Sequence, residues 1–559
     1  MKKILLASVL ALVMLLGLWF YARPAYQRHR ETRAIALARG YLAKGDYQNA
    51  SLSARQALRV NPSNLEACRM MTDLAEQSHS PCVLDWRRRI VDLAPTVDNR
   101  LKLASTALRS QGPPYPLAAQ TLDELKDTAA SVAAYHVVSA ELALRLKRSA
   151  VALDHFERAS RLEPTNELYQ LNLAVLQLQS TNAAALPAAR STLERLRASS
   201  NVGVVALRWL VSEHLRRDDL NSAQQFSRQL LANPHSQSDD RLQHLGILRQ
   251  SNSSEFGAYL TVLQKNALTN AMEIYGISAW LIGHGLVDGA LGWLTHCPAK
   301  LQAEQPVPLA LVDCLVAKRD WVGLETALSQ QKWGELEFLR QAFWSRAAFE
   351  QNQKLAADMR WRTAVRETGD RLGPKTALLS LATSWGRPQA REDLLWQIAH
   401  RFPRERWALR ELERSYLAAG NTLGLNKVYS ALASFDPKNL AIKNNLAATS
   451  LLLRINVPRA HELARELFSQ HPEEAIVAST YAFSLHLQGR TKPGLAALDK
   501  LKPEALETPS VALYYGLLLS ATDQTNQAGK YLRIAQRSEL LPEEKALVGE
   551  ALKQIGPRA

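Results

Sequence analysis

The sequence contains few of the residues that mark several unusual classes of protein. Four cysteines in 559 residues are too few for a disulfide scaffold. Gly (25) and Pro (24) are close to average, which excludes collagen-like and low-complexity chains. Apolar residues make up 47% and charged residues 22% of the chain. A chain of this composition can bury a core, so we expect a folded protein with several structural units.

The chain also lacks a dense basic stripe, although its net charge is +15. Residues 1–33 hold six Lys and Arg against one Glu, which accounts for five of these charges and leaves ten for the rest of the chain. Proteins that neutralise a phosphate backbone concentrate their positive charge on one face. We therefore expect no nucleic-acid partner.

Motifs that carry catalysis are missing as well. The sequence contains no phosphate-binding loop, dinucleotide-binding glycine motif, nucleophile elbow, Cys-x-x-Cys or His-Glu-x-x-His. Its only adjacent His/Cys pair is His296–Cys297, and a zinc site needs three or four ligands. We predict a structural role for His296, no metal, no cofactor and no enzyme activity.

The amino terminus has the pattern of a membrane segment. Two lysines precede an uncharged run at 4–22, and Arg23 ends it. A helix of about 19 residues spans a hydrocarbon core of about 30 Å. The run is longer than the apolar part of a cleaved signal peptide, and it ends in an aromatic cluster at 19–21 in place of an Ala-x-Ala site. These features favour an uncleaved signal anchor over a cleaved signal peptide.

The flanking charges leave the orientation of this anchor nearly balanced, because basic residues occur on both sides. A short basic start before an apolar run is typical of an exported anchor. We predict a single-pass protein of the bacterial inner membrane with its main domain in the periplasm, and the cytoplasmic orientation is the alternative. The corresponding segments are a basic start at 1–3, the anchor at 4–22 and a juxtamembrane linker at 23–30.

A frame of 34 residues repeats through the rest of the chain. In 31–64, small residues at frame positions 8, 20 and 27 allow two helices to approach closely, and large residues at 11 and 17 fill the space beside them. A Gly-Asp pair ends the first helix and an Asn-Pro pair ends the second. The frame residues are Ala38, Tyr41, Gly45, Tyr47, Ala50, Ala54, Ala57 and Pro62.

Further copies of this frame occur along the chain, and between residues 31 and 541 there is room for about fifteen of them. A last helix is predicted from Pro542 to about Gln554, with Glu543, Glu544, Lys545 and Lys553 facing water. Good copies lie at 133–166, 406–439, 441–474 and 509–541, weaker ones at 203–236, 271–303 and 372–405, and degenerate ones at 98–132 and 237–270.

This pattern resembles the tetratricopeptide repeat (TPR) family, here as a membrane-anchored bacterial member. The resemblance implies an all-α fold: a right-handed α-solenoid of about fifteen TPR-like helix hairpins over 31–541, after one N-terminal transmembrane helix. A capping helix and tail would occupy 542–559. Sel1-like and HEAT solenoids are the structural alternatives, and their periods fit 34 residues less well.

The resemblance also implies where partners bind. In this family the first helix of each repeat lines the concave face, and frame positions 2, 5 and 9 are among those that point inward. In two adjacent copies, this groove wall would hold Trp407, Arg410, Arg414, Asn445 and Thr449. Such a wall suits an extended or helical peptide of acidic character. The alternative for Trp407 is packing between helices.

Nine of the twelve tryptophans lie in 280–407, which suggests a binding stripe. The frame assigns Trp321, Trp344 and Trp361 to core positions, so we predict core packing for these three. It leaves Trp280, Trp385, Trp396 and Trp407 open.

The four cysteines fall in neighbouring predicted helices. Two disulfides, Cys68–Cys82 and Cys297–Cys314, are conceivable outside the cytoplasm. Free cysteines are usually small buried residues, so we predict four buried thiols.

The function that the resemblance implies is that of a membrane-tethered scaffold, which binds partner proteins or peptides in its concave groove. Tethering would raise the effective concentration of the bound partners. By family analogy, the setting is envelope assembly, polysaccharide export or secretion. The alternatives are a non-catalytic accessory subunit of an envelope enzyme complex and an RNA-binding helical-repeat protein, which would need a recurring polar column that is missing here. The oligomeric state stays open.

Overall fold

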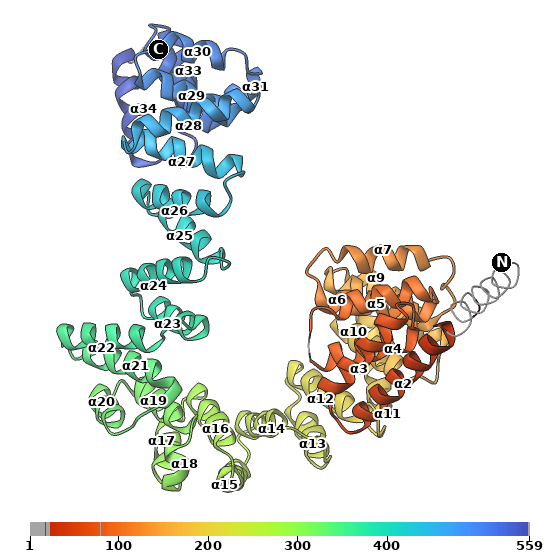
Figure 1. Ribbon diagram of the computed structural model, residues 1–559. Helices are drawn as coiled ribbons and strands as arrows, with labels where there is room; N and C mark the ends of the chain where they lie inside the picture. Colours follow the sequence, from red (N-terminus) through yellow and green to blue (C-terminus); the bar gives the residue numbers. More distant parts are fainter. Residues whose placement is uncertain (1–16, 18–22, 79, 557–559) are drawn as a thin grey trace, which may run out of the picture. The chain divides into compact units, whose positions relative to one another are not determined.

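The computed structural model describes residue 17 and residues 23–78 and 80–556, and every regular element within these residues is a helix. The predicted all-α class is therefore confirmed for the described residues. The chain divides into two compact units, Met1–Trp280 and Leu281–Ala559. Figure 1 shows successive helices folding back on one another within each unit.

The predicted membrane anchor at 4–22 lies outside the described residues, except for Gly17. Among the helices that the structure describes, none combines the length and the apolar character that a bilayer crossing requires. The first of them, α2, runs from Arg23 to Ala43. The segment 23–30, for which we expected a linker, is the exposed first part of this helix.

Helix hairpins in the first unit follow the predicted frame. The copy at 31–64 folds as α2 and α3 (Tyr47–Val60), and the degenerate stretches 98–132 and 237–270 fold as helix pairs too. The other helices are α4 (Leu65–Gln77), α5 (Val83–Leu93), α6 (Val97–Ser110), α7 (Pro116–Leu125), α8 (Ala133–Arg145), α9 (Ser149–Leu162), α10 (Glu167–Gln179), α11 (Leu186–Leu196), α12 (Gly203–Arg216), α13 (Leu220–Leu231), α14 (Ser238–Gln250), α15 (Phe256–Ala267) and α16 (Ala271–Gly283).

Local chemistry explains the turn of the first hairpin. Gly45 has φ = +72°, a left-handed conformation that glycine adopts without steric cost. The side chain of Asp46 then accepts a hydrogen bond from the backbone N–H of Asn49 at 3.1 Å and caps α3. The alanines at the predicted small positions have no exposed surface, which lets the two helices approach closely: Ala38, Ala50 and Ala57.

In the second unit, the good copies of the frame also coincide with helix pairs: α25 and α26, α27 and α28, and α32 and α33. The number of repeats and the handedness of the solenoid stay predictions. The helices are α17 (Val287–Thr295), α18 (Ala299–Ala303), α19 (Val307–Lys318), α20 (Trp321–Ser329), α21 (Glu337–Glu350), α22 (Lys354–Glu367), α23 (Leu372–Ser384), α24 (Pro388–Arg401), α25 (Trp407–Ala418), α26 (Thr422–Phe435), α27 (Leu440–Leu453), α28 (Val457–Gln470), α29 (Ala475–Leu487), α30 (Thr491–Leu498), α31 (Pro503–Leu506), α32 (Pro509–Ser520), α33 (Thr525–Ala535) and α34 (Pro542–Ile555).

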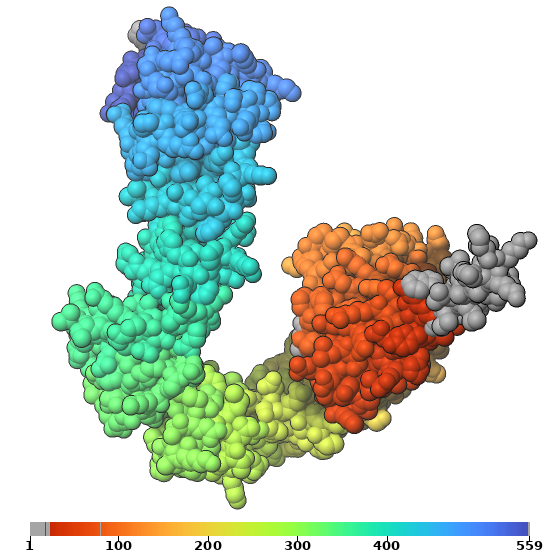
Figure 2. All heavy atoms as spheres, in the orientation of Figure 1, coloured from red at the N-terminus to blue at the C-terminus, as the bar shows by residue number. Residues whose placement is uncertain are grey.

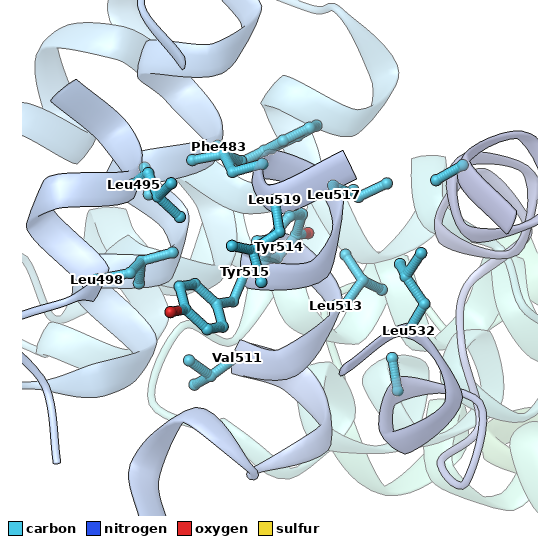
Figure 3. Close-up of a cluster of buried hydrophobic side chains, with 14 of the residues drawn as sticks. Phe483, Leu495, Leu498, Val511, Leu513, Tyr514, Tyr515, Leu517, Leu519 and Leu532 are labelled. Carbon is cyan, nitrogen blue, oxygen red and sulfur yellow. The ribbon is translucent and has the colours of Figure 1, made fainter. Parts of the chain in front are cut away.

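Helix α32 is the centre of the C-terminal core. All nine residues from 511 to 519 are buried, so the helix is covered on every side. Figure 3 shows its side chains surrounded by those of α29, α30 and α33. The rings of Phe483 and Tyr514 lie 4.6 Å apart within this core. At Gly516, an added Cβ would lie 2.9 Å from Leu532, so the glycine permits the close approach of α33.

The last helix, α34, begins and ends close to the predicted positions, but one expectation about it is wrong. Lys545 and Lys553 are exposed as predicted, whereas Glu543 and Glu544 are partly buried. Helix α34 packs against α32 and α33 and reaches back to α27, so part of its first turn is covered by earlier hairpins.

Candidate functional site

Helix α25 presents an open face that contains two of the five predicted binding residues. Arg410 is exposed, and the side chain of Arg414 is 76% exposed. Leu417 is 51% exposed, and Ala418 is exposed beside it. The spacings of four and three residues place Arg410, Arg414 and Leu417 on one side of the helix. We call these four residues the open α25 face.

Trp407, the third predicted residue, has a different role. It is half-buried at the start of α25 and packs against the core that α24, α25 and α26 share. Its Nε1 donates a hydrogen bond to Oε2 of Glu405 at 3.0 Å. Trp407 therefore packs between helices, which was the alternative interpretation of its position.

The two predicted residues of α27 lie between helices. Thr449 is only 4% exposed. Its Oγ1 donates to the carbonyl oxygen of Asn445 at 2.7 Å and accepts from Nδ2 of Asn426 at 3.1 Å. Asn445 is half-buried. The structure thus groups Arg410 and Arg414 on one surface and places Thr449 in the contact between α26 and α27.

Asn445 takes part in a polar bridge between first helices. The side chain of Tyr429 on α26 forms hydrogen bonds with Asn445 of α27 and with Glu413 of α25. Burial, and after it the negative charge of Glu413, raises the pKa of Tyr429 well above its usual value of 10. The phenol therefore stays neutral and donates to Glu413, which fixes α25 relative to α27.

The ion pairs around α25 leave the guanidinium of Arg410 available to bind a partner's carboxylate. Glu411 forms ion pairs with Arg414 at 2.6 Å and with Arg391 of α24 at 3.1 Å. Within the described residues, no carboxylate lies within ion-pair distance of Arg410, which keeps its hydrogen-bond donors in solvent. The open α25 face therefore has a net positive character.

Exposed hydroxyl groups occupy the equivalent frame positions of the preceding first helix, α23. Ser380 and Thr383 of α23 are both exposed. Their hydroxyl groups donate to the carbonyl oxygens of Thr376 at 3.1 Å and Leu379 at 2.8 Å. These hydroxyl oxygens keep acceptor capacity toward solvent, so this side of α23 is polar and carries only short side chains at these two positions.

Most of the tryptophans in 280–407 pack between helices. Trp321, Trp344 and Trp361 are half-buried against hydrophobic cores, as the frame predicted, and Trp385 packs with them. Arginines lie over several of these rings: Cζ of Arg360 is 3.4 Å from the centroid of Trp344. A stack of guanidinium groups and aromatic rings stabilises neighbouring hairpins, so the abundance of tryptophan reflects packing.

Sequence reasoning missed a cavity on the opposite side of these hairpins. It has a volume of about 660 Å³ and lies between the second helices α24 and α26, with Leu409 of α25 among its lining residues. Trp396 and His400 stack in its wall with ring centroids 5.4 Å apart. Its space exists because small residues from two helices face each other, and no sequence motif signals this: Ala399, Ser430, Ala431 and Ser434.

The cysteines and His296 show no catalytic arrangement among the described residues. All four cysteines are free thiols, and Cys82 is exposed although we expected it to be buried. Burial raises the pKa of Cys314 to about 11, which keeps this thiol protonated. Nδ1 of His296 lies 2.6 Å from the carbonyl oxygen of Gly292. No group of three His, Cys, Asp or Glu residues in the described ranges could hold a metal ion.

Comparisons with known proteins give no family by sequence. No family model matches the chain, and no curated protein matches it. Solved structures do match. The structure of Pseudomonas aeruginosa pilF aligns with 40% of this chain and 99% of its own, at 19% identity and a TM-score of 0.32.

Two further solved structures are similar to this chain. PilW, described as a widely conserved type IV pilus biogenesis factor, aligns with 42% of this chain and 93% of its own, at 17% identity and a TM-score of 0.26. A chain of the APC/C hetero-tetramer Cut9–Hcn1 aligns with 94% of this chain and 98% of its own, at 11% identity and a TM-score of 0.30. Identities and TM-scores this low do not transfer partners or functions to this chain.

Proposed function

We propose that this chain is a protein-interaction scaffold, and that its open α25 face binds an acidic segment of a partner protein. The observation that carries this proposal is the pair of exposed arginines, Arg410 and Arg414, one helical turn apart beside the exposed Leu417. Exposed arginines beside a large exposed apolar side chain match the composition of protein-binding surfaces.

The recognition chemistry follows from the two arginines. Guanidinium groups bind carboxylates through two parallel hydrogen bonds, and a hydrogen bond to a charged group contributes about 1.5–3 kcal/mol. Arg410 offers its donors directly. Arg414 would exchange its contact with Glu411, and an exposed ion pair of this kind contributes only about 0–1 kcal/mol. Leu417 adds apolar contact, so an acidic segment with one apolar side chain fits best.

The proposal includes a membrane tether. The uncharged run at 4–22 supports a single-pass anchor in a bacterial inner membrane, with the helical repeats in the periplasm. A tether of this kind confines bound partners to the membrane surface and raises their effective concentration there. The chain would act by binding alone, without catalysis, in a process such as envelope assembly, polysaccharide export or secretion.

A crosslinking experiment in intact cells tests the binding surface. The full chain is compared with the double variant Arg410→Glu plus Arg414→Glu, and crosslinked proteins are identified by mass spectrometry. The matched control is Arg459→Glu plus Arg465→Glu, which reverses two exposed arginines on α28. We expect the α25 variant to lose at least one partner that the control keeps. An unchanged set of partners would remove the α25 face as the binding surface.

A fusion tests the tether separately. Alkaline phosphatase joined after Ala559 folds and is active only outside the cytoplasm. We expect an active fusion in the membrane fraction. An inactive fusion would place the repeats in the cytoplasm, and an active fusion in the soluble fraction would show that the segment at 4–22 is removed.

A further inference from the structure

The first-helix side of the last hairpins is covered, in contrast to that of α25. Arg414 occupies frame position 9 of its repeat and is exposed. The equivalent residues of α29 and α32 are Phe483 and Leu517, which are 2% and 7% exposed. Both belong to the same buried core as Val548 and Ala551 of α34. Helix α34 packs against α32 and α27, so it covers part of the first-helix side of these hairpins.

Helix α34 has the form of an amphipathic ligand. Its apolar residues recur at spacings of one, four, five and eight, which places them on one face, and its other face is exposed. Only two of its residues, Val548 and Ala551, are fully buried, whereas nine residues of α32 are. The apolar face consists of Leu547, Val548, Ala551, Leu552 and Ile555.

Polar contacts fix the start of α34 on distant hairpins. Oγ1 of Thr422 donates a hydrogen bond to the carboxylate of Glu543, across 121 positions of sequence. The phenol of Tyr514 donates to Oε1 of Glu544 at 3.3 Å, and Oε2 of Glu544 accepts from the backbone N–H of Leu541 at 2.9 Å. The surface thus binds a helix that begins with two adjacent carboxylates and continues with an apolar face.

The connection of α34 allows it to leave without unfolding a hairpin. The segment 536–541 joins it to α33, and it is not one of the two helices of any hairpin described above. Its departure would break the contacts described above and would leave the pairing of α32 with α33, and of α29 with α30, unchanged.

We propose that the first-helix side of α27 to α32, together with Thr422 at the start of α26, is a helix-binding groove, which α34 fills in the free chain and from which a partner's amphipathic helix displaces it. The partner helix begins with two acidic residues and carries apolar residues with the spacing found in α34. Its carboxylates bind Thr422 and Tyr514, and its apolar face packs on α32 as that of α34 does. None of the residues that this groove uses belongs to the open α25 face, so the two proposals fail independently.

Hydrogen exchange of the full chain tests whether α34 leaves its site. We expect the backbone amides of α34 to exchange at least tenfold faster than those of α32, because α34 would open locally while α32 exchanges only when the hairpins unfold. Equal protection of α34 and α32 would show that α34 is a permanent part of the core and would overturn the proposal.

A peptide of residues 540–556 serves as the helix probe. It is labelled with a fluorophore and titrated against the full chain and against the full-length variant Val548→Asp plus Leu552→Asp, in which α34 is undocked. We expect binding to the variant at least tenfold tighter than to the unchanged chain, where α34 competes for the groove. Hydrogen exchange of α32 in the variant verifies that the hairpins remain folded.

A second peptide with the same two aspartates is the matched control for the probe, and we expect it not to bind. If the variant keeps its protected α32 and still does not bind the 540–556 peptide, the groove does not accept a helix in trans and the proposal fails. If the α32 amides of the variant lose their protection, the peptide titration no longer tests the groove. The relative exchange rates of α34 and α32 in the unchanged chain then decide whether the proposal holds.

Discussion

Two adjacent parts of the second unit share one repeat frame but differ in whether other helices cover their first helices. From α23 to α26 the first helices expose Ser380, Arg410 and Arg414, whereas from α27 to α32 the equivalent side is buried. Figure 2 shows the second part (blue) as a broader block than the first (teal). The sequence of a repeat therefore decides its hairpin, whereas the packing of neighbouring helices and of α34 decides how much of its face stays open.

The largest contrast between the two parts should come from truncating one leucine in each. Leu518 of α32 has no exposed surface, so Leu518→Ala should destabilise the C-terminal core by about 2–5 kcal/mol. Leu417→Ala on the open α25 face should change stability by at most about 0.5 kcal/mol. Hydrogen exchange of α32 and α25 amides measures both effects. A similar loss for both variants would mean that the α25 face is covered in solution.

A smaller effect is expected from glycine substitutions in the two parts. A Cβ at Gly424 would lie 2.6 Å from the ring of Tyr416, whose hydroxyl donates to Glu392 and accepts from Trp396. Overpacking costs about 1–3 kcal/mol, against a gain in helix propensity of up to about 1 kcal/mol. Gly424→Ala should therefore destabilise the α25–α26 hairpin by about 1 kcal/mol, as seen in the protection of α26 amides.

Gly549 of α34 provides the control, because nothing lies within 4 Å of an added Cβ there. Gly549→Ala should stabilise α34 by up to about 1 kcal/mol and slow its hydrogen exchange. If Gly424→Ala proved equally stabilising, the close contact between α26 and the Tyr416 ring would be refuted.

Weakening the polar contact that ties α34 to α26 should have a still smaller effect. Glu543→Gln keeps a hydrogen-bond acceptor for Thr422 but removes its charge, so the loss should be about 1 kcal/mol or less. The amides of α34 should then exchange up to about fivefold faster. Glu550→Gln on the exposed side of α34 is the control and should have no effect. Equal exchange in both variants would show that Thr422 does not hold α34.

The smallest expected effect is a dependence of α34 docking on pH. Burial raises the pKa of Glu544 above its usual 4.5, although the N–H of Leu541 and the phenol of Tyr514 oppose this shift and the charge of Glu543 adds to it. The docked helix therefore binds a proton more readily than the undocked one. Its stabilising effect is complete below pH 4.5 and is lost as the pH rises through the raised pKa.

Hydrogen exchange of α34, corrected for the intrinsic rate at each pH, measures this dependence. We expect exchange to accelerate as the pH rises from about 4 to 7, and Glu544→Gln should abolish the change. An opposite trend in the unchanged chain would mean that the capping bond to Leu541 outweighs the burial of Glu544.

The sequence predicted much of the local fold, because the signals that define hairpins act over a few residues. Gly45 and Asp46 end one helix and begin the next within two positions, and Pro542 marks the start of α34 where it was expected. The candidate site was less accessible to sequence reasoning. Arg410 and Arg414 lie on an open face, but the frame cannot distinguish an exposed threonine from Thr449, which Asn426 of the preceding helix holds in a buried contact.

The sequence alone thus determined that the chain folds into helix hairpins and where several of their turns lie, since capping groups and left-handed glycines act on their immediate neighbours. Only the tertiary structure decided which first helices stay open. That outcome depends on contacts such as the one between Thr422 and Glu543, which join residues 121 positions apart. The physical reason is that a residue is buried only when another surface packs against it in the folded chain. The periodicity within a repeat does not indicate which distant helix will pack against that repeat.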